Sequence, residues 1–105
     1  MIRASIIKKD GNYKAFSFLG HAEYSEAGTD IVCAAASVLI INTANAIESL
    51  TDNEIKGSDE DGIFFEFPNP PDEKGRLLID AMILGLEDIR KKYGEKYLTL
   101  KYEEV

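Results

Sequence analysis

Apolar and polar residues alternate along the first twenty positions of the chain, which is the pattern of half-buried β-strands. Residues 3–9 carry the β-branched residues Ile6 and Ile7, and residues 13–19 alternate, with packing positions at Tyr13, Ala15 and Phe16 to Phe18. The Asp-Gly-Asn sequence at residues 10–12 is a strong turn signal between them. The pattern therefore predicts a β-hairpin whose second strand ends at Gly20.

The spacing of apolar residues then changes to the three-to-four interval of a helix, which we expect to run from Asp30 to about Leu50. Thr29 or Asp30 can act as N-cap, because a short side-chain oxygen satisfies free amides of the first turn. The predicted buried face comprises Val32, Ala35, Ala36, Leu39, Thr43, Ala46, Ile47 and Leu50. With this start, Cys33 falls in the first helical turn.

The second half of the chain predicts two more strands, a helix and a last strand. A short strand is expected at residues 54–56, an acidic turn at 57–62, and a clear strand at 63–67 that is ended by prolines. A helix follows from Asp72 to about Tyr93, capped by Gly94, and residues 97–102 form the final strand. The expected apolar stripe of this helix is Leu77, Leu78, Ala81, Met82, Leu84 and Ile89.

The order β-β-α-β-β-α-β predicts an α+β fold of two layers, a five-stranded sheet with two helices on one face. The length of 105 residues suits a single domain over residues 1–105. The longest nearly apolar run, residues 32–41, is about half of the ~20 residues that a membrane span needs. We therefore expect a soluble cytoplasmic protein with no membrane partner and no leader segment.

Charge and cysteine content narrow the function classes. The formal net charge is −7, and acidic surfaces repel nucleic acid backbones, so we expect no direct nucleic-acid partner. The same charge favours a basic protein partner or good solubility. A single cysteine excludes an internal disulfide and fits a reducing compartment. With a single histidine as well, a zinc site would need two carboxylates, and we expect no metal.

The only histidine and the only cysteine, His21 and Cys33, lie twelve positions apart across a small polar loop. A thiol with an imidazole beside it is the minimal equipment of cysteine nucleophilic catalysis. Free amides at the helix start would favour a thiolate and could hold a developing oxyanion. Asp30 would either cap the helix or orient the imidazole, and Ser37, one turn beyond Cys33, could donate a hydrogen bond to the sulfur or to a substrate carbonyl.

Each of these residues also has an ordinary structural interpretation. A lone cysteine in a helix rich in alanine and valine is usually an inert small hydrophobe. A histidine after a strand-ending glycine is usually an exposed loop residue, and Asp30 is more simply an N-cap. The phenylalanines at 64, 65 and 67 are more typical of a core than of a binding platform, and the acidic residues 59–61 of a solvated turn.

Two linked motifs favour catalysis. Gly20-His21-Ala22, followed by Gly28-x-Asp30-x-Val32-Cys33-Ala34-Ala35-x-Ser37, resembles the signature of the ribosomal-processing cysteine protease family (Prp). The resemblance covers the whole chain, because its length and element order also suit that family. By this resemblance Cys33 is the nucleophile and His21 the general base, and Asp30, Ser37, Gly20 and Gly28 match positions close to the site.

The resemblance further implies a small cytoplasmic bacterial endopeptidase, typically a homodimer, without a metal or organic cofactor. Its substrate would be a basic precursor, large-subunit ribosomal protein twenty-seven, whose N-terminal extension is removed after a pair of phenylalanines. The loop from Gly20 to Asp30 would order over the bound peptide. The alternatives are a non-catalytic dimeric acidic protein that binds a basic ribosomal component and, less favoured because no resolving cysteine exists, a redox-sensing thiol.

Overall fold

Seven elements follow one another in the predicted order. The structure is a computed structural model that describes residues 2–20, 27–59 and 62–105, with residues 27–30 described by their backbone. The elements are β1 (Ile2–Lys9), β2 (Asn12–Gly20), α1 (Ala27–Leu50), β3 (Lys56–Ser58), β4 (Ile63–Glu66), α2 (Glu73–Tyr93) and β5 (Leu98–Glu104).

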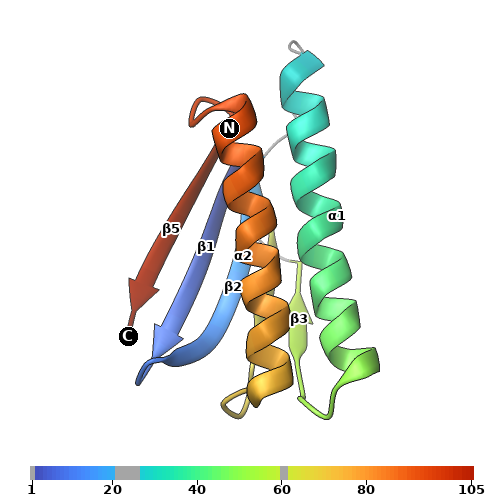
Figure 1. Ribbon diagram of the computed structural model, residues 1–105, viewed down its shortest axis with the longest axis vertical. Coiled ribbons are helices and arrows are strands. Elements are labelled where there is room, and N and C mark those ends of the chain that lie inside the picture. The colour runs from blue at the N-terminus through green and yellow to red at the C-terminus, as the bar shows by residue number, and fades with distance from the viewer. Residues whose placement is uncertain (1, 21–26, 60–61) are drawn as a thin grey trace.

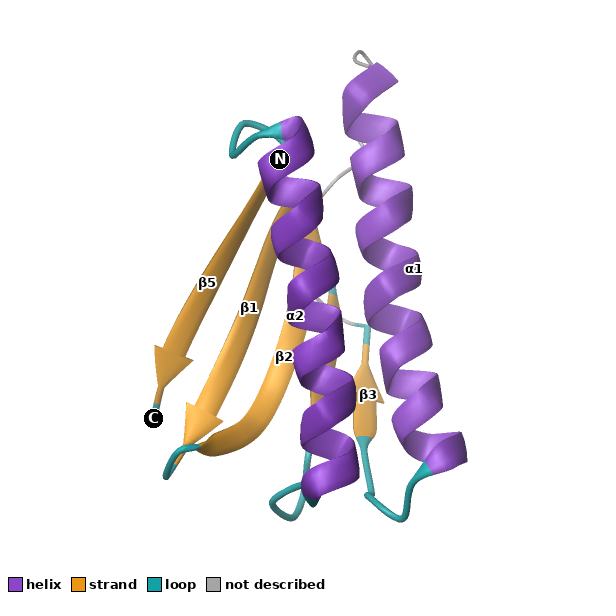
Figure 2. Ribbon diagram, in the orientation of Figure 1, coloured by secondary structure: helices purple, strands orange, loops and turns teal. Residues whose placement is uncertain are grey.

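The five strands form one sheet in the order β3-β4-β2-β1-β5. Neighbouring strands are antiparallel except for β1 and β5, which run parallel. Both helices lie side by side on the same face of this sheet (Figures 1 and 2). The predicted α+β class, with two layers and two helices on one face, is therefore confirmed.

The hairpin between β1 and β2 forms where the turn signal predicts it. Asp10 and Gly11 both have positive φ, 53° and 78°. Positive φ at both central residues is the type I′ geometry, whose twist matches that of the flanking strands. The register shifts by one residue between Ile7 and Lys8, as at a β-bulge.

The start of α2 is fixed by polar contacts that the sequence predicts in part. Asp72 is the N-cap, and its carboxylate accepts a hydrogen bond of 3.0 Å from the Gly75 N–H. The side chain of Asn53 donates to the same carboxylate at 2.7 Å and accepts from the Asp72 N–H at 2.8 Å. Gly94 closes the helix with a positive φ of 100°, as predicted.

The hydrophobic core fills the space between the sheet and the two helices. On the sheet its members include Ile2, Ala4, Ile6, Phe16, Phe18 and Leu98, and on the helices Val32, Ala36, Ile40, Ala44, Ile47, Ile79, Met82 and Leu86. By length and composition alone, the helical segment Ile31–Leu50 could cross a membrane. This apolar segment is longer than the run at residues 32–41 that the sequence analysis identified. In this fold one side of that helix packs against the core.

The predicted buried faces of the helices need correction. On α1, Ile40 and Ala44 are buried although the prediction omits them, whereas Leu50 is 73% exposed because it lies beyond the last buried turn. On α2 the buried residues are Gly75, Ile79, Met82 and Leu86, a 4-3-4 spacing that follows one helix face. Ala81 is exposed, and so are Leu77 and Leu84, which lie seven residues apart on the opposite face of the helix. The assignment of these three residues to the buried apolar stripe of α2 was therefore wrong.

Strand β3 also differs from its prediction. It begins at Lys56 rather than at residue 54, because only Lys56–Ser58 lie opposite β4, with Gly57 facing Phe65. Phe67 is fully buried, as expected of a core residue, whereas Phe64 and Phe65 are half-buried. Of the acidic run, Asp59 is exposed, and residues 60–61 lie outside the described residues.

Candidate active site

Cys33 lies in the second turn of α1, and this corrects the sequence analysis. The helix begins at Ala27, three residues before the predicted start at Asp30, so Cys33 is its seventh residue and lies beyond the first turn. The helix therefore includes Gly28 and Thr29, although both are poor helix formers. Neither Thr29 nor Asp30 is therefore the N-cap.

The earlier start changes which amides are free. The four N–H groups without a partner in an α-helix are those of its first four residues, here 27–30. The amide of Cys33 is in register with the carbonyl of residue 29 and belongs to the helical ladder. The expectation that Cys33 lies in the first turn, among the free amides, is wrong, whereas the role of those amides in holding an oxyanion stays a prediction.

The thiol of Cys33 lies at the margin of the core. Cys33 is half-buried and packs against the buried cluster, while its neighbours Val32 and Ala36 are fully buried and Ala34 is exposed. It is a free cysteine. A half-buried thiol is held in place by packing and still has a solvent-facing side, which suits a nucleophile better than a sealed packing residue.

Ser37 shares this side of the helix. Residues four apart lie one above the other on a helix surface, about 6 Å apart along the axis. Ser37 is half-buried, like Cys33. The prediction that Ser37 lies one turn beyond the cysteine on the same face is consistent with the position of both in α1.

The remaining predicted site residues flank these two. Gly20 is the last residue of β2, opposite Ile2 of β1, and Gly28 is the second residue of α1. Asp30 is the fourth residue of the same helix, one turn before Cys33. His21 and most of the loop between β2 and α1 lie outside the described residues, so the role of His21 stays a prediction.

The titratable groups with clearly shifted pKa values lie on other elements. Burial, and then the hydrogen bond to Asp80, raises the pKa of Tyr13 at the start of β2. The hydrogen bond from Asn53 lowers the pKa of Asp72, and the hydrogen bond from Arg90 lowers the pKa of Glu87. The contacts of Asp80 and Asp72 join α2 to β2 and to Asn53, whereas the pair of Arg90 and Glu87 lies within α2. Within residues 2–20, 27–59 and 62–105, no group of three His, Cys, Asp or Glu side chains could hold a metal ion.

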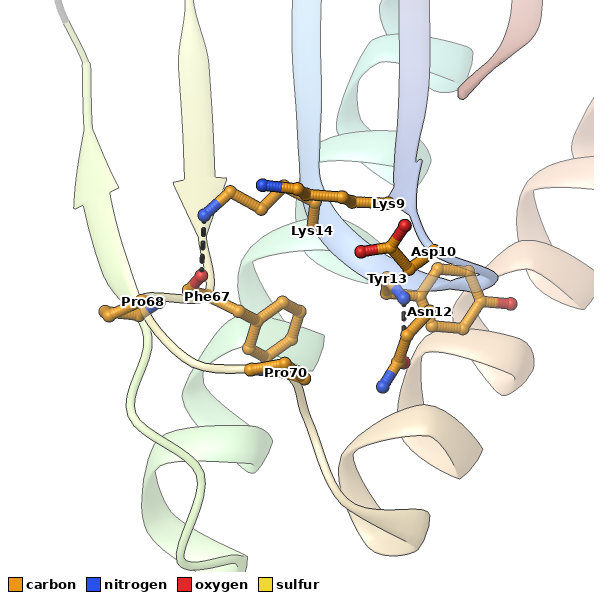
Figure 3. Close-up of a pocket in the computed structure, with 8 residues that line it drawn as sticks. All are labelled: Lys9, Asp10, Asn12, Tyr13, Lys14, Phe67, Pro68 and Pro70. Atoms are coloured by element: carbon orange, nitrogen blue, oxygen red, sulfur yellow. Dashed lines mark hydrogen bonds between the residues drawn. The ribbon is translucent and has the colours of Figure 1, made fainter. Parts of the chain in front are cut away.

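In the part of the chain that the structure describes, two surface cavities bear on the search for a site. One, of about 360 Å³, lies at the hairpin turn, at the opposite end of β2 from Gly20. Figure 3 shows its walls, with Phe67, Pro68 and Pro70 on one side and Asp10 and Asn12 on the other; the Lys14 ammonium donates to the Phe67 carbonyl at 3.2 Å. This cavity is not part of the site around Cys33.

The second cavity, of about 430 Å³, lies beside α1. It is lined by Ile41, Gly57, Ser58, Asp59, Ile63 and Phe65. Sequence analysis did not identify it, because its walls come from one helix and two strands that are distant in sequence. The signal that could have pointed to it is the position of Ile41, eight residues beyond Cys33 and therefore on a similar side of the helix.

Comparison with known proteins identifies the family. The family model described as "Cysteine protease Prp" matches residues 1–98. The chain is 37% identical over 103 residues to the ribosomal processing cysteine protease Prp of Bacillus subtilis, an alignment that covers 90% of this chain and 92% of the relative.

Solved structures agree with this similarity. The ribosomal processing protease Prp of S. aureus in complex with a substrate peptide superposes with a TM-score of 0.85 and 28% identity, covering 97% of this chain and 99% of that one. The same S. aureus protease with a covalently linked product peptide gives a TM-score of 0.83 and 27% identity, again over 97% and 99% of the two chains. Family and fold together favour a protease over the non-catalytic binding protein and the redox sensor, and this chain belongs to the cysteine protease Prp family, enzymes that hydrolyse peptide bonds.

Proposed function

We propose that this protease removes the N-terminal extension of large-subunit ribosomal protein twenty-seven, with Cys33 as nucleophile and His21 as general base, cutting after a pair of phenylalanines. The observation that carries the proposal is the position of Cys33: a free, half-buried thiol on α1 in a chain whose first 98 residues match a cysteine protease family. The name of the B. subtilis relative, a ribosomal processing protease, supports the choice of substrate.

The proposed reaction has two stages. His21 accepts the thiol proton of Cys33, the sulfur attacks the scissile carbonyl, and the C–N bond breaks as His21 returns the proton to the leaving amine. A water molecule, deprotonated by His21, then hydrolyses the thioester and releases the N-terminal fragment. The S. aureus protease with a covalently linked product peptide supports a covalent route of this kind.

Ser37 and Asp30 would assist this reaction from either side of Cys33. Ser37, one turn further along α1, would donate a hydrogen bond to the sulfur or to the substrate carbonyl. Asp30, one turn earlier, would orient the imidazole of His21. Gly20 and Gly28 would hold the ends of the loop that orders over the bound peptide.

The proposal also covers the compartment, the oligomeric state and the partners of the protein. We expect a cytoplasmic homodimer that engages neither nucleic acid nor a membrane. A net charge of −7 supports a basic ribosomal precursor as substrate, since opposite charges speed association.

The test is incubation of the native protein with the extended ribosomal precursor from the same organism, followed by mass spectrometry of the products. One cut directly after the phenylalanine pair is expected. Intact precursor would contradict the proposal, and so would a cut elsewhere in the chain. A precursor that binds without being cut would instead support a non-catalytic binding role.

A further inference from the structure

The cavity beside α1 lies on the helix side of the sheet at its β3 edge. Its apolar wall consists of Ile41 from α1 with Ile63 and Phe65 from β4, and the exposed Asp59 lies at the rim. Figure 1 shows β3 beside α1, and β3 is the outermost strand of the described sheet. The result is an open trough with an apolar floor, a negative rim and a strand along one side.

Gly57 keeps this trough open. It faces Phe65 across the β3–β4 pair, and a Cβ at Gly57 would lie 2.9 Å from Cε1 of the Phe65 ring. Any side chain here would press against the ring and fill the space above it. Phe65 is half-buried, and its ring packs at a tilt against Phe16 of the core at a centroid distance of 5.3 Å, so the floor of the trough is joined to the core.

The trough lies further along the side of α1 that carries Cys33. Cys33, Ser37 and Ile41 are spaced four residues apart in α1, so they follow one side of the helix. At 1.5 Å per residue, Ile41 lies about 12 Å along the axis from Cys33. An extended peptide advances about 3.3 Å per residue, so this distance corresponds to about three or four substrate residues.

The chemistry of the trough fits a peptide in particular. An outermost strand offers backbone N–H and C=O groups to an extended segment, the apolar floor takes one side chain, and Asp59 complements a basic neighbour. We infer that the trough is a specificity subsite, which binds an apolar substrate side chain about three or four residues from the bond that Cys33 cleaves. This inference rests on the proposed function, since it takes the substrate peptide to lie along α1.

The experiment compares peptides that span the cleavage site and differ at one position each, with leucine, phenylalanine, alanine or aspartate at every position up to five residues on either side. For the native protein we expect, besides the phenylalanine pair itself, one further position about three or four residues from the cut to favour leucine over aspartate by about 10- to 100-fold in kcat/KM. The Ile41→Trp variant should fill the trough and reduce this preference at least about fivefold at that position alone. Most of the change should appear in KM.

Val38→Trp is the matched control. Val38 lies on the same helix and is 67% exposed, outside the trough lining, so the same bulk there should leave the preference as in the native protein. Ile41→Ala is a second variant, which enlarges the trough and should shift the preference from leucine toward phenylalanine. Ile41 is 39% exposed, so truncation there leaves the core intact.

The outcomes separate this inference from the proposed function. If the native protein cleaves the peptides but both Ile41 variants keep the native preference at every position, the trough is not a subsite and the proposed function stands. If the folded native protein cleaves no peptide, the proposed function fails, and this inference fails with it.

Discussion

Leu39 of α1 packs directly against the backbone of α2 at Gly85. A Cβ built at Gly85 would lie 2.6 Å from Cδ2 of Leu39, closer than atoms of folded proteins approach without rearrangement. The two helices can therefore lie this near to each other because residue 85 has no side chain. The contact holds α1, the helix that carries Cys33, against α2.

Replacing Gly85 by valine should lower the free energy of unfolding by about 1 to 3 kcal/mol, because the added side chain overpacks the helix contact. Urea unfolding measures the change. Ala81→Val, at an exposed position on the same helix, measures the cost of a valine without overpacking, which should be no more than about 0.7 kcal/mol. Valine is a better helix former than glycine, so a larger loss in Gly85→Val comes from the contact with Leu39. A Gly85→Val protein as stable as this control would show that the contact does not constrain the helices.

The hydrogen bond from the Tyr13 hydroxyl to the Asp80 carboxylate predicts an alkaline limit to stability. Burial and Asp80 raise the pKa of Tyr13 above its ordinary value of 10.0. The folded protein thus keeps the proton where the unfolded chain loses it, so this contribution is intact below about pH 10 and is lost as the pH rises further. Tyr13→Phe should cost about 1.5 kcal/mol at pH 7.

The pH dependence provides the control for this contact. Unfolding free energies of the native protein and of Tyr13→Phe should converge between pH 10 and the raised pKa, since the variant has no Tyr13 proton to lose. A constant difference between the two proteins across that range would contradict the assigned cause of the shift.

The N-cap of α2 predicts an acid limit. Hydrogen bonds from Asn53 and from the Gly75 N–H lower the pKa of Asp72, so the folded protein holds this carboxylate ionised where the unfolded chain protonates it. The stability that this group contributes is complete above the ordinary aspartate pKa and is lost as the pH falls through the lowered value. Asp72→Asn keeps a capping oxygen and should flatten the acid limb of stability against pH, as measured by urea unfolding. If the fall in stability at low pH were the same in Asp72→Asn as in the native protein, other carboxylates would cause it.

Local signals predicted much of this fold. The Asp-Gly turn, the start of α2 at Asp72 and its end at Gly94 are each set by a few neighbouring residues, and each is found within one residue of its predicted place. The errors arise where distant contacts decide. Leu77 and Leu84 were assigned to the core because they are apolar, but the face of α2 that packs on the sheet carries Gly75, Ile79, Met82 and Leu86. The length of β3 depends on which of its residues pair with β4.

In the candidate site, too, local features could be predicted from the sequence and features that depend on distant contacts could not. The positions of Cys33 and Ser37 on one helix follow from sequence spacing, but the depth of Cys33 in that helix depended on where the helix begins. The trough beside Ile41 could not be predicted, because it exists only once β3 and β4 pack beside α1.

The role of His21 can be tested by substitution with alanine. Loss of a general base should lower kcat/KM for the ribosomal precursor by at least about 100-fold, while the unfolding free energy stays near that of the native protein. Steady-state cleavage rates and urea unfolding together measure both quantities. Native turnover by His21→Ala would require another base for the thiol.

The most direct test of the whole account is the cleavage rate of the extended ribosomal precursor by the native protein and by Cys33→Ala, with precursor binding measured in parallel. The account predicts that kcat/KM falls at least about a thousandfold in the variant while the precursor still binds with native affinity. Cleavage by Cys33→Ala at a rate close to the native one would contradict it, because the thiol would then not be the nucleophile.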